Sequence, residues 1–420
     1  MNLRRIYLRM TIILLTNRFP FINGEPFLIE EIKLASKNEY KIILFPMDTN
    51  NSALMFDYSK YPNINLHKMN NSYSRKIIRL KHISQLIKIW TNEIFFLCKA
   101  NKLSYVTLRR SISVLLESER IRCHVEDLCQ DITDNIVLYS YWGAISSLAI
   151  ALIKNENIYK LTRVHRVDLY EYWHFNDYLP YKQYIYNRLN SIISISEDGF
   201  NYIKKRYPYA KEKIFISRLG TDDYGLNPEE KKQKIVVVSC SNIIEVKRVP
   251  LICKALCDIT DIPIHWVHFG DGNQMENVKS IINQSKQKNL SIELKGYTLK
   301  KEIFDWYANN HVDIFINASL SEGIPVSIME AYSFGIPAIA TDVGGTSEIV
   351  NNTNGWLINK ETAHVEIINA IRQYYTLCNN DIRDKRFQAR NTWEEKFSSQ
   401  INYKKFYEKL EINVKKMQNK

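Results

Sequence analysis

Two carboxylates, Glu322 and Glu330, lie eight positions apart in the segment DIFINASLSEGIPVSIMEAYSFGIPAIATDVGGTSEIV, residues 313–349. A carboxylate accepts hydrogen bonds from two neighbouring hydroxyl groups. A ribose offers such a diol, and so does a pyranose ring. Either glutamate alone is more often a solvated surface residue, but the residues around this pair favour a site for a sugar nucleotide.

The residues around the two glutamates predict a strand, a tight turn and a helix. Residues 313–318 form a short apolar run and are expected to be a buried strand. A turn at Glu322 follows, then a helix that Gly335 ends, and then a second strand at residues 336–340. Glu322 is therefore on a loop at the carboxyl end of a parallel strand, with Glu330 in the next helix. Open α/β sheets bind ligands at this edge.

The start of this helix is suited to an anion. Pro325 can take the first helical position, where its missing N–H group leaves no hydrogen bond unmade. The N–H groups of Gly323, Ile324 and the neighbours of Pro325 open a helix whose N-terminus attracts negative charge.

The segment resembles the E-x7-E motif of family 4 glycosyltransferases, which are retaining enzymes with the GT-B fold. In that family the second glutamate holds the ribose of the nucleotide, and the first contacts the transferred sugar. The resemblance therefore implies a ribose-binding role for Glu330 and a catalytic, sugar-binding role for Glu322.

Other segments resemble the family in the expected order along the chain. The resemblance implies a phosphate-binding lysine at Lys247, a glycine turn at Gly272, a passage beside the base at Gly296 and Tyr297, and a His-x-x-Asp element at His165 and Asp168. The segments are VSCSNIIEVKRVPLICKAL (238–256), HFGDG (268–272), ELKGYT (293–298), HRVDLYEYW (165–173) and NRFPFINGEPFLIEEI (17–32). The last one resembles the first loop of a polysaccharide-assembly branch of the family.

The resemblance implies an α/β protein of GT-B type, with two Rossmann-like, doubly wound parallel-sheet domains that face each other across a cleft. Alternating strands and helices independently predict parallel sheets with helices on both faces. The expected domains are residues 1–220 on the acceptor side and residues 235–380 on the donor side, joined by a polar linker at 221–234. Residues 381–420 are expected to form helices that return to the first domain.

The phosphate-binding segment departs from the family pattern at two positions. Asn242 occupies the position of the usual arginine, and Arg248 occupies that of the usual glycine. An arginine forms two-pronged bonds to phosphate that asparagine cannot form. Either Lys247 makes most of the contacts to phosphate with help from Arg248, or this chain binds the diphosphate more weakly than the family pattern implies.

Four residues of the amino-terminal half have open interpretations. His165 is expected near the donor sugar or phosphate, as a catalytic residue, and Asp168 either orients it or holds the local turn. Gly24 permits close approach of a ligand to the backbone. Glu25 binds acceptor hydroxyls or caps the helix that starts near Pro26.

The charge and composition of the chain predict that it binds an anionic surface. The net charge is +12, and the basic stretch at residues 75–110 interleaves nine Lys and Arg with apolar residues against one acid, Glu93. This pattern is typical of a helix on an anionic membrane, or of one that packs its apolar face on the domain. No nucleic-acid motif accompanies it, and no segment is a convincing membrane span or signal peptide. The scattered cysteines suggest a reducing cytoplasm, so we expect a cytoplasmic protein on the inner membrane face.

The resemblance implies a hexosyl-type glycosyltransferase (EC 2.4) of polysaccharide, capsule or lipopolysaccharide assembly. It would use a UDP- or GDP-sugar, a glycan or lipid-linked acceptor, and no metal or cofactor, since the chain has no Asp-x-Asp motif. The alternatives are a nucleotide-sugar epimerase of similar fold and a non-catalytic, membrane-associated subunit that binds glycans or sugar nucleotides.

Overall fold

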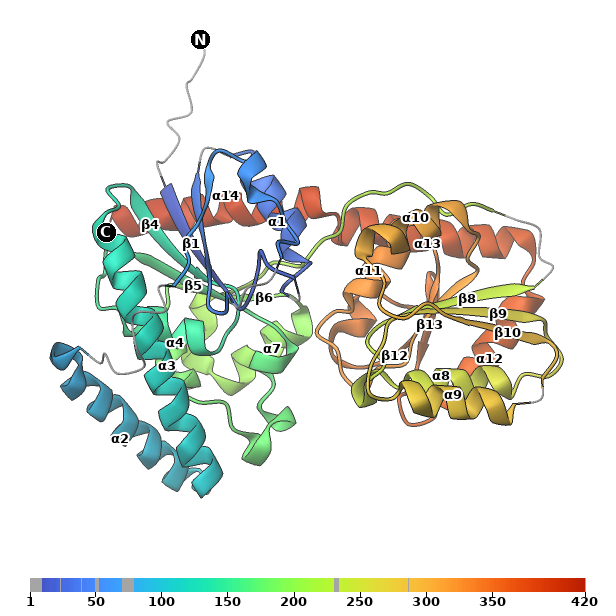
Figure 1. Cartoon of the computed structure of the whole chain (residues 1–420), viewed down its shortest axis with the longest axis horizontal. Coiled ribbons are helices and arrows are strands. Elements are labelled where there is room, and N and C mark those ends of the chain that lie inside the picture. Colours follow the sequence, from blue (N-terminus) through green and yellow to red (C-terminus); the bar gives the residue numbers. More distant parts are fainter. Residues whose placement is uncertain are drawn as a thin grey trace, which may run out of the picture. The chain divides into compact units, whose positions relative to one another are not determined.

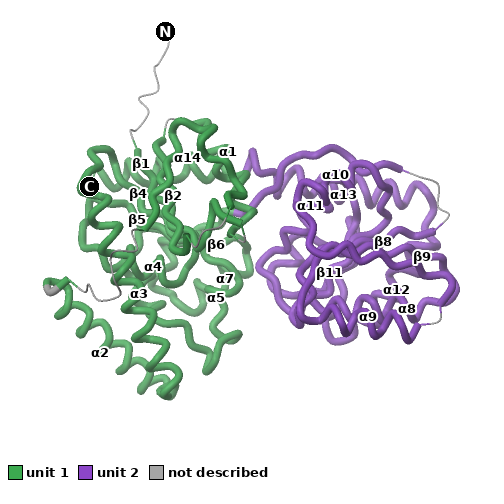
Figure 2. Tube along the Cα trace, viewed as in Figure 1, with its two compact units in different colours: residues 1–217, 403–420 green, residues 218–402 purple. Residues whose placement is uncertain are grey.

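The computed structural model describes residues 10–22, 24–38, 40–49, 53–69, 79–229, 234–285 and 287–419. The chain forms two compact units (Figure 2), with unit 1 made of residues 1–217 and 403–420, and unit 2 made of residues 218–402. The boundaries therefore differ from the divisions at 220, 234 and 380 that the sequence predicts.

The start of the predicted linker is part of unit 2. The side-chain amide of Asn227 donates to the carbonyl of Tyr307 at 2.6 Å, and its oxygen accepts from the N–H of Val312 at 2.9 Å. Asn227 is buried. These bonds fix the polar stretch to the sheet that follows it.

Unit 1 has a parallel sheet of seven strands in the order β3-β2-β1-β4-β5-β6-β7. Six of the strands coincide with predicted apolar runs near residues 11–16, 41–46, 136–141, 161–165, 192–196 and 214–217. Ile64–Leu66 has only two apolar side chains, separated by Asn65, and gives no such signal. The bounds are β1 Met10–Thr16, β2 Lys41–Pro46, β3 Ile64–Leu66, β4 Asn135–Ser140, β5 Tyr159–Val164, β6 Ser191–Ser194 and β7 Ile214–Ile216.

The helices of unit 1 include a long pair inserted between β3 and β4, drawn beside each other in Figure 1. The apolar seam of α2, formed by Leu86, Ile89 and Leu97, is buried, and α2 packs against α3. The bounds are α1 Leu28–Ala35, α2 Ile83–Lys99, α3 Tyr105–Gln130, α4 Ile145–Leu152, α5 Arg166–Leu169, α6 Lys182–Arg188 and α7 Glu197–Arg206.

Unit 2 has a parallel sheet of six strands in the order β10-β9-β8-β11-β12-β13. The strand order reverses between β8 and β11, where Val237 pairs with Ile314. Such a reversal is the usual ligand site of a doubly wound sheet. The bounds are β8 Ile235–Cys240, β9 Ile264–Phe269, β10 Leu290–Leu294, β11 Ile314–Asn317, β12 Ala338–Thr341 and β13 Gly355–Ile358.

Helices cover both faces of this sheet. In Figure 1, α8, α9 and α12 lie on one face, where their apolar residues share one core, and α10, α11 and α13 lie on the other. The bounds are α8 Val249–Cys257, α9 Met275–Gln284, α10 Lys300–Asn309, α11 Val326–Ser333, α12 Ala363–Thr376, α13 Asn379–Lys396 and α14 Ser399–Gln418. The predicted α/β class with two doubly wound parallel sheets is confirmed.

The last helix, α14, completes the core of unit 1. From Tyr403 onward its residues belong to that unit, and Phe406 packs among the strands. The fully buried guanidinium of Arg163 lies 5.0 Å from the Phe406 ring centroid and pairs with Glu31 at 3.5 Å. Within the described ranges, no helix combines the length and the apolar character that crossing a bilayer requires.

Candidate functional site

Glu322 lies on the loop after β11, at the carboxyl edge of the unit 2 sheet. Its Oε1 is 2.5 Å from the ammonium nitrogen of Lys247 and accepts from the Ser319 hydroxyl at 2.7 Å and from the Asn317 amide at 3.3 Å. The Glu322 side chain is 11% exposed and that of Lys247 is 26% exposed. The structure therefore joins two predicted site residues from loops 75 positions apart.

Glu330, on α11, forms a second ion pair. Its Oε1 is 3.0 Å from the ammonium nitrogen of Lys300, the first residue of α10. The side chains are 15% and 27% exposed respectively, so both remain within reach of solvent. Lys300 carries no motif that marks it in the sequence.

Lys247 follows β8 and Glu322 follows β11, so their ion pair lies at the carboxyl ends of two neighbouring strands. Burial and the negative charge of Glu330 raise the pKa of the Cys240 thiol to about 12, while Lys247 and Lys300 oppose that rise. Charges act on one thiol in this way only when they lie close to it. The site therefore sits at the switch point between β8 and β11.

Glycines let the loops of this site approach each other closely. Gly344 has a φ of +55°, and a Cβ there would lie 2.0 Å from the carbonyl oxygen of Glu322. The next residue, Gly345, donates to the carbonyl of Gly323 at 2.7 Å. A Cβ on Gly272 would lie 2.4 Å from the carbonyl oxygen of Ile243. Larger residues would separate these loops and shift Glu322.

The helix expected beside Glu322 begins one residue later than the sequence predicts. Pro325 precedes α11 with extended angles of −71° and 110°, and Val326 is the first helical residue. Gly323 and Ile324 lie just before it, and within the described ranges their N–H groups donate no hydrogen bond. They are therefore available to an anionic ligand.

The two departures from the family pattern differ in their surroundings. Asn242 is exposed. Arg248 has a left-handed φ of +50° and donates from Nε to the carbonyl of Ala318 at 2.6 Å and from Nη1 to that of Lys360 at 2.7 Å. Its guanidinium therefore ties three loops together, and its expected help in phosphate binding stays a prediction.

Gly296 and Tyr297 lie on the turn after β10. Gly296 accepts from the N–H of Gly270 at 2.8 Å, which holds this turn to the one after β9. Tyr297 is 70% exposed, so an aromatic face is open at the same edge of the sheet. Its contact with a base stays a prediction.

The carboxyl edge of the unit 1 sheet has a buried network around Asp168. Asp168 accepts from the backbone N–H groups of His165 at 2.6 Å and Gly143 at 2.5 Å. The Lys182 ammonium donates to the carbonyls of Gly143, at 2.6 Å, and Asp168. Burial raises the pKa of Asp168 to about 6 and lowers the pKa of Lys182 to about 8. Of the two roles considered for Asp168, these bonds favour holding the turn.

His165 follows β5 and lies within a cage of aromatic rings. Its ring centroid is 4.6 Å from that of Trp142, 5.1 Å from that of Tyr141 and 5.8 Å from that of Phe27. Burial and the charge of Arg163 lower the pKa of His165 to about 3, so the imidazole is neutral near pH 7. Its Nε2 has no hydrogen-bond partner within the described ranges.

Glu25 anchors the loop after β1. Its carboxylate accepts from the N–H groups of Asn17 at 2.6 Å and Phe19 at 2.8 Å, and from the indole of Trp142 at 2.7 Å. It does not cap α1, which has no side-chain cap. A Cβ on Gly24 would lie 2.7 Å from the N atom of Phe19, so close backbone packing explains this glycine. Acceptor binding by this pair stays a prediction.

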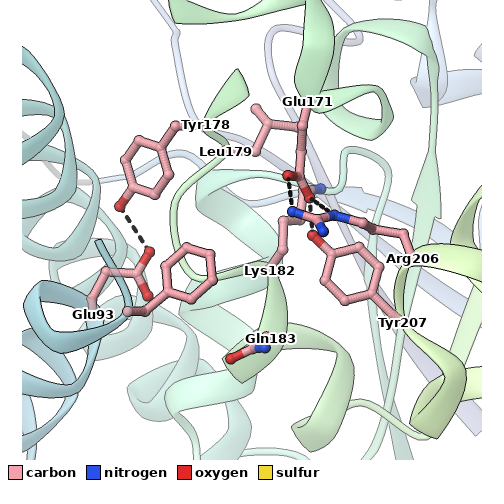
Figure 3. A pocket seen from close by; sticks show the side chains of 9 residues that line it. Glu93, Glu171, Tyr178, Leu179, Lys182, Gln183, Arg206 and Tyr207 are labelled. Carbon is pink, nitrogen blue, oxygen red and sulfur yellow. Dashed lines mark hydrogen bonds and ion pairs between the residues drawn. The ribbon is translucent and has the colours of Figure 1, made fainter. Parts of the chain in front are cut away.

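A small cavity in unit 1 is too small for a sugar, and the residues of its wall hold neighbouring segments together (Figure 3). Its volume of about 70 Å³ has room for only about two water molecules. At its wall Tyr178 donates to Glu93 at 2.7 Å, and Arg206 donates to Glu171 at 3.0 Å. These bonds fix the segment after α5 to helices α2 and α7.

One group of described residues has the types of a metal site, namely His82, Glu119 and Cys123. The Arg122 guanidinium lies 3.3 Å from Glu119 and already supplies a positive charge. Burial raises the pKa of the Cys123 thiol to about 11, which disfavours the thiolate that a metal needs. The group is better explained as part of an ion-pair network with Arg79 and Glu126.

Comparisons with known proteins show a family match in unit 2 and a shared fold. Residues 233–376 match the family described as Glycosyl transferases group 1. A relative from Escherichia coli K12, named as the colanic acid biosynthesis glycosyltransferase WcaL, is 23% identical over 252 residues, which are 57% of this chain and 61% of that protein. The chain spans between 28% and 61% of the lengths of the first three curated relatives it matches.

Two solved structures share the fold along nearly the whole chain. A glycosyltransferase from Rickettsia africae has a TM-score of 0.66 at 17% identity, with coverage of 99% of this chain and 100% of its own. Anabaena Alr3699/HepE, solved with UDP and glucose, has a TM-score of 0.64 at 14% identity, with coverage of 96% and 99%. These structures confirm the predicted GT-B fold, and the family match at residues 233–376 agrees with the resemblance to family 4, or group 1, glycosyltransferases.

Proposed function

Residues 233–376 match the group 1 glycosyltransferases, in a chain of GT-B fold. From this premise we propose that the protein transfers a hexosyl group from a nucleotide sugar to a glycan acceptor. The observation that carries the proposal is the pairing of Lys247 with Glu322 and of Lys300 with Glu330 at the switch point of unit 2. The E. coli relative named for colanic acid biosynthesis supports a role in polysaccharide assembly.

In this proposal Glu330, Glu322 and Lys247 bind the donor. Their ion pairs hold these side chains in place when no donor is bound. The ribose diol binds Glu330, the transferred sugar contacts Glu322, and the diphosphate binds Lys247. Each carboxylate is partly exposed and already orders a lysine beside it. Because a charged hydrogen bond to a donor hydroxyl can replace part of each pair, binding requires little loop movement.

The chemical step is departure of a nucleoside diphosphate from the anomeric carbon. Negative charge grows on the leaving phosphate, and preorganised positive groups lower the barrier. The Lys247 ammonium and the N–H groups of Gly323 and Ile324 are suited to receive that charge. Retention of configuration and a catalytic role for His165 follow from the family resemblance alone.

For the donor, a UDP-sugar is the first choice. The Anabaena structure was solved with UDP and glucose, and this chain has the same fold. The exposed Tyr297 ring offers a surface for a base, and every base has a π face. A GDP-sugar remains the second class to test.

For the acceptor, we propose a lipid-linked glycan at an anionic membrane surface. Besides its buried seam, α2 has an exposed face with Ile87 at 57% and Phe95 at 71% exposure, and Tyr105 at the start of α3 is 78% exposed. Lys99 and Arg109 are exposed beside them. Apolar and aromatic residues flanked by cations are suited to a membrane interface. Both sequence interpretations of this stretch are therefore compatible with the structure.

The deciding experiment measures thermal stabilisation of the purified protein by UDP-, GDP- and ADP-sugars, in the wild type and in Glu330→Ala. A ligand that binds only the folded protein raises its unfolding temperature. We expect one donor class to stabilise the wild type and not the variant. Identical behaviour of both proteins with every donor would contradict the donor assignment, and donor binding without transfer to membrane acceptors would favour a non-catalytic subunit.

The proposed transfer does not need a metal, since lysine and helix N–H groups receive the leaving charge. We expect EDTA to leave activity unchanged. Activity lost with EDTA and restored by manganese would contradict this.

A further inference from the structure

A second hollow of unit 1, at the opposite edge of its sheet from His165 and Asp168, collects positive charge. It has a volume of about 620 Å³ and lies between the first half of α2, the turn after α4 and the end of α6. Three cations line it, namely Lys88, Lys154 and Arg188. The other lining residues are Ser84, Gln85, Ile89, Asn92, Tyr184 and Asn187, and the lining includes no carboxylate.

The floor of this hollow is organised by fixed polar groups. The Gln85 amide donates to the carbonyl of Leu152 at 3.3 Å and to the Tyr184 hydroxyl at 3.4 Å, while Arg122 donates to its oxygen at 3.3 Å. The Arg188 guanidinium lies 5.7 Å from the centroid of the Tyr184 ring. The hollow is thus built from elements that already hold one another.

The three cations are not neutralised by the protein. Within the described ranges, no carboxylate lies within ion-pair distance of Lys88, Lys154 or Arg188. Burial lowers the pKa of Lys160, Arg188 lowers it further, and Glu156 raises it. Glu156 is not in the lining of the hollow. Elsewhere on the same unit arginines are paired, as Arg79 is with Glu126. Like charges that share a hollow repel one another, and an anion relieves that repulsion.

We infer that this hollow binds a phosphate ester. Lysine and arginine are the usual partners of phosphate, and the arginine can bind in a two-pronged manner. The volume is in the range of pockets that hold small ligands, so a phosphate together with a sugar or a glycerol group can enter. Asn92 and Asn187, on the rim, can donate to hydroxyl groups of such a ligand.

The inference goes beyond the proposed transfer reaction because the hollow lies at the other end of the sheet. Lys154 precedes β5 and Arg188 precedes β6, so both are at the amino ends of strands. His165 and Asp168 follow the carboxyl end of β5. The phosphate ester bound here is therefore not the group that reacts, and it is either a free sugar phosphate or the headgroup of an anionic lipid.

The test compares a triple variant, Lys88→Gln with Lys154→Gln and Arg188→Gln, against a charge-matched control, Lys204→Gln with Lys205→Gln and Lys211→Gln. The control residues are exposed on α7 and the following turn. Binding of diphosphate and glucose 1-phosphate is measured by titration calorimetry on the full chain. Binding to phosphatidylglycerol vesicles, against phosphatidylcholine vesicles, is measured by co-sedimentation. Thermal unfolding verifies that both variants are folded.

We expect the hollow variant to bind at least one of these probes about tenfold more weakly than the control. Loss of the soluble probes identifies a free phosphate ester, and loss of the vesicles alone identifies a lipid headgroup. Because the donor site is intact in every protein, it contributes equally and does not affect the difference. Equal binding of all probes by the two variants, whether both are weakened or neither is, would overturn the inference.

Discussion

The charged side chains at the carboxyl edges of the two parallel sheets differ in exposure. They are partly exposed in unit 2 and buried in unit 1. In unit 2 the pairs Lys247–Glu322 and Lys300–Glu330 are between 11% and 27% exposed. In unit 1 Asp168 and Lys182 are buried, and every bond that the structure gives Asp168 goes to backbone atoms of the same edge or to its lysine neighbour. A partly exposed pair can exchange its partner for a ligand, whereas a buried network fixes the shape of a loop.

Burial also changes the protonation of the unit 1 groups. It raises the pKa of Asp168 to about 6 and lowers that of His165 to about 3. Desolvation favours the neutral form of each group. The edge of unit 1 is therefore a buried wall in which His165 is neutral near pH 7, and the edge of unit 2 has the partly exposed charges that suit a nucleotide. Four substitutions test this difference.

The largest effect is expected for Lys247→Ala. It removes the positive charge at the proposed leaving group, and loss of one such group typically lowers the rate constant about 100-fold or more. Steady-state transfer kinetics measure it, with Lys254→Ala on the exposed face of α8 as the control. Unchanged turnover would show that the charge of Lys247 is not needed for transfer. The two sheet edges would then not differ in function.

Next in size is Glu330→Ala. The lost hydrogen bonds of a carboxylate to the ribose diol are expected to weaken donor binding about tenfold or more. Calorimetric titration of the donor measures the affinity, and Glu276→Ala is the control because that side chain is 83% exposed on α9. Wild-type affinity in Glu330→Ala would reassign the glutamate to a structural ion pair with Lys300.

Arg248→Ala sharpens the comparison within unit 2. Because its guanidinium donates to the carbonyls of Ala318 and Lys360, we expect stability to fall by about 1–3 kcal/mol while donor affinity changes little. Thermal unfolding and donor titration separate the two properties. A tenfold weaker donor affinity with an unchanged melting temperature would instead support the phosphate role predicted for this residue.

The smallest effect is the pH response of His165. Its pKa falls from 6.5 unfolded to about 3 folded, so its contribution to stability is present above pH 6.5 and is lost as the pH falls toward 3. Asp168 acts in the opposite sense, because its raised pKa stabilises the fold below about pH 3.8 and that contribution is lost as the pH rises through 6.

We therefore expect the melting temperature of the wild type to fall more between pH 7 and pH 5 than that of His165→Asn, which cannot titrate there. Differential scanning calorimetry at both pH values measures this. Parallel curves for the two proteins would mean that His165 is hydrated and titrates normally, and the wall would then be as accessible as the unit 2 edge.

The sequence was a good guide to strands and to the acidic motif, and a poor guide to partners. Buried apolar runs marked strands such as Met10–Thr16 and Ile235–Cys240 because parallel strands are covered on both faces. The strand Ile64–Leu66 was missed because its two apolar side chains are separated by Asn65 and form no apolar run.

Lys300 could not be predicted as the partner of Glu330, because their pairing depends on how α10 and α11 pack and not on spacing. Gly143 and Lys182 could not be predicted either, because they complete the Asp168 network from other elements. A signal was present for Asn317 and Ser319, since Asn317 is the last residue of the strand that leads to Glu322 and Ser319 comes two residues later. Polar residues at a strand end could have added them to the predicted site.

The path of α14 has a consequence for biosynthesis. Unit 1 needs Phe406, Tyr407 and Leu410 to close its core over Arg163, and these residues leave the ribosome after all of unit 2 has been made. Unit 2 can therefore finish folding first, although most of unit 1 is synthesised earlier. A nascent chain that stops before α14 would expose a guanidinium normally shielded from water, and such a chain is a natural target for chaperones or proteases.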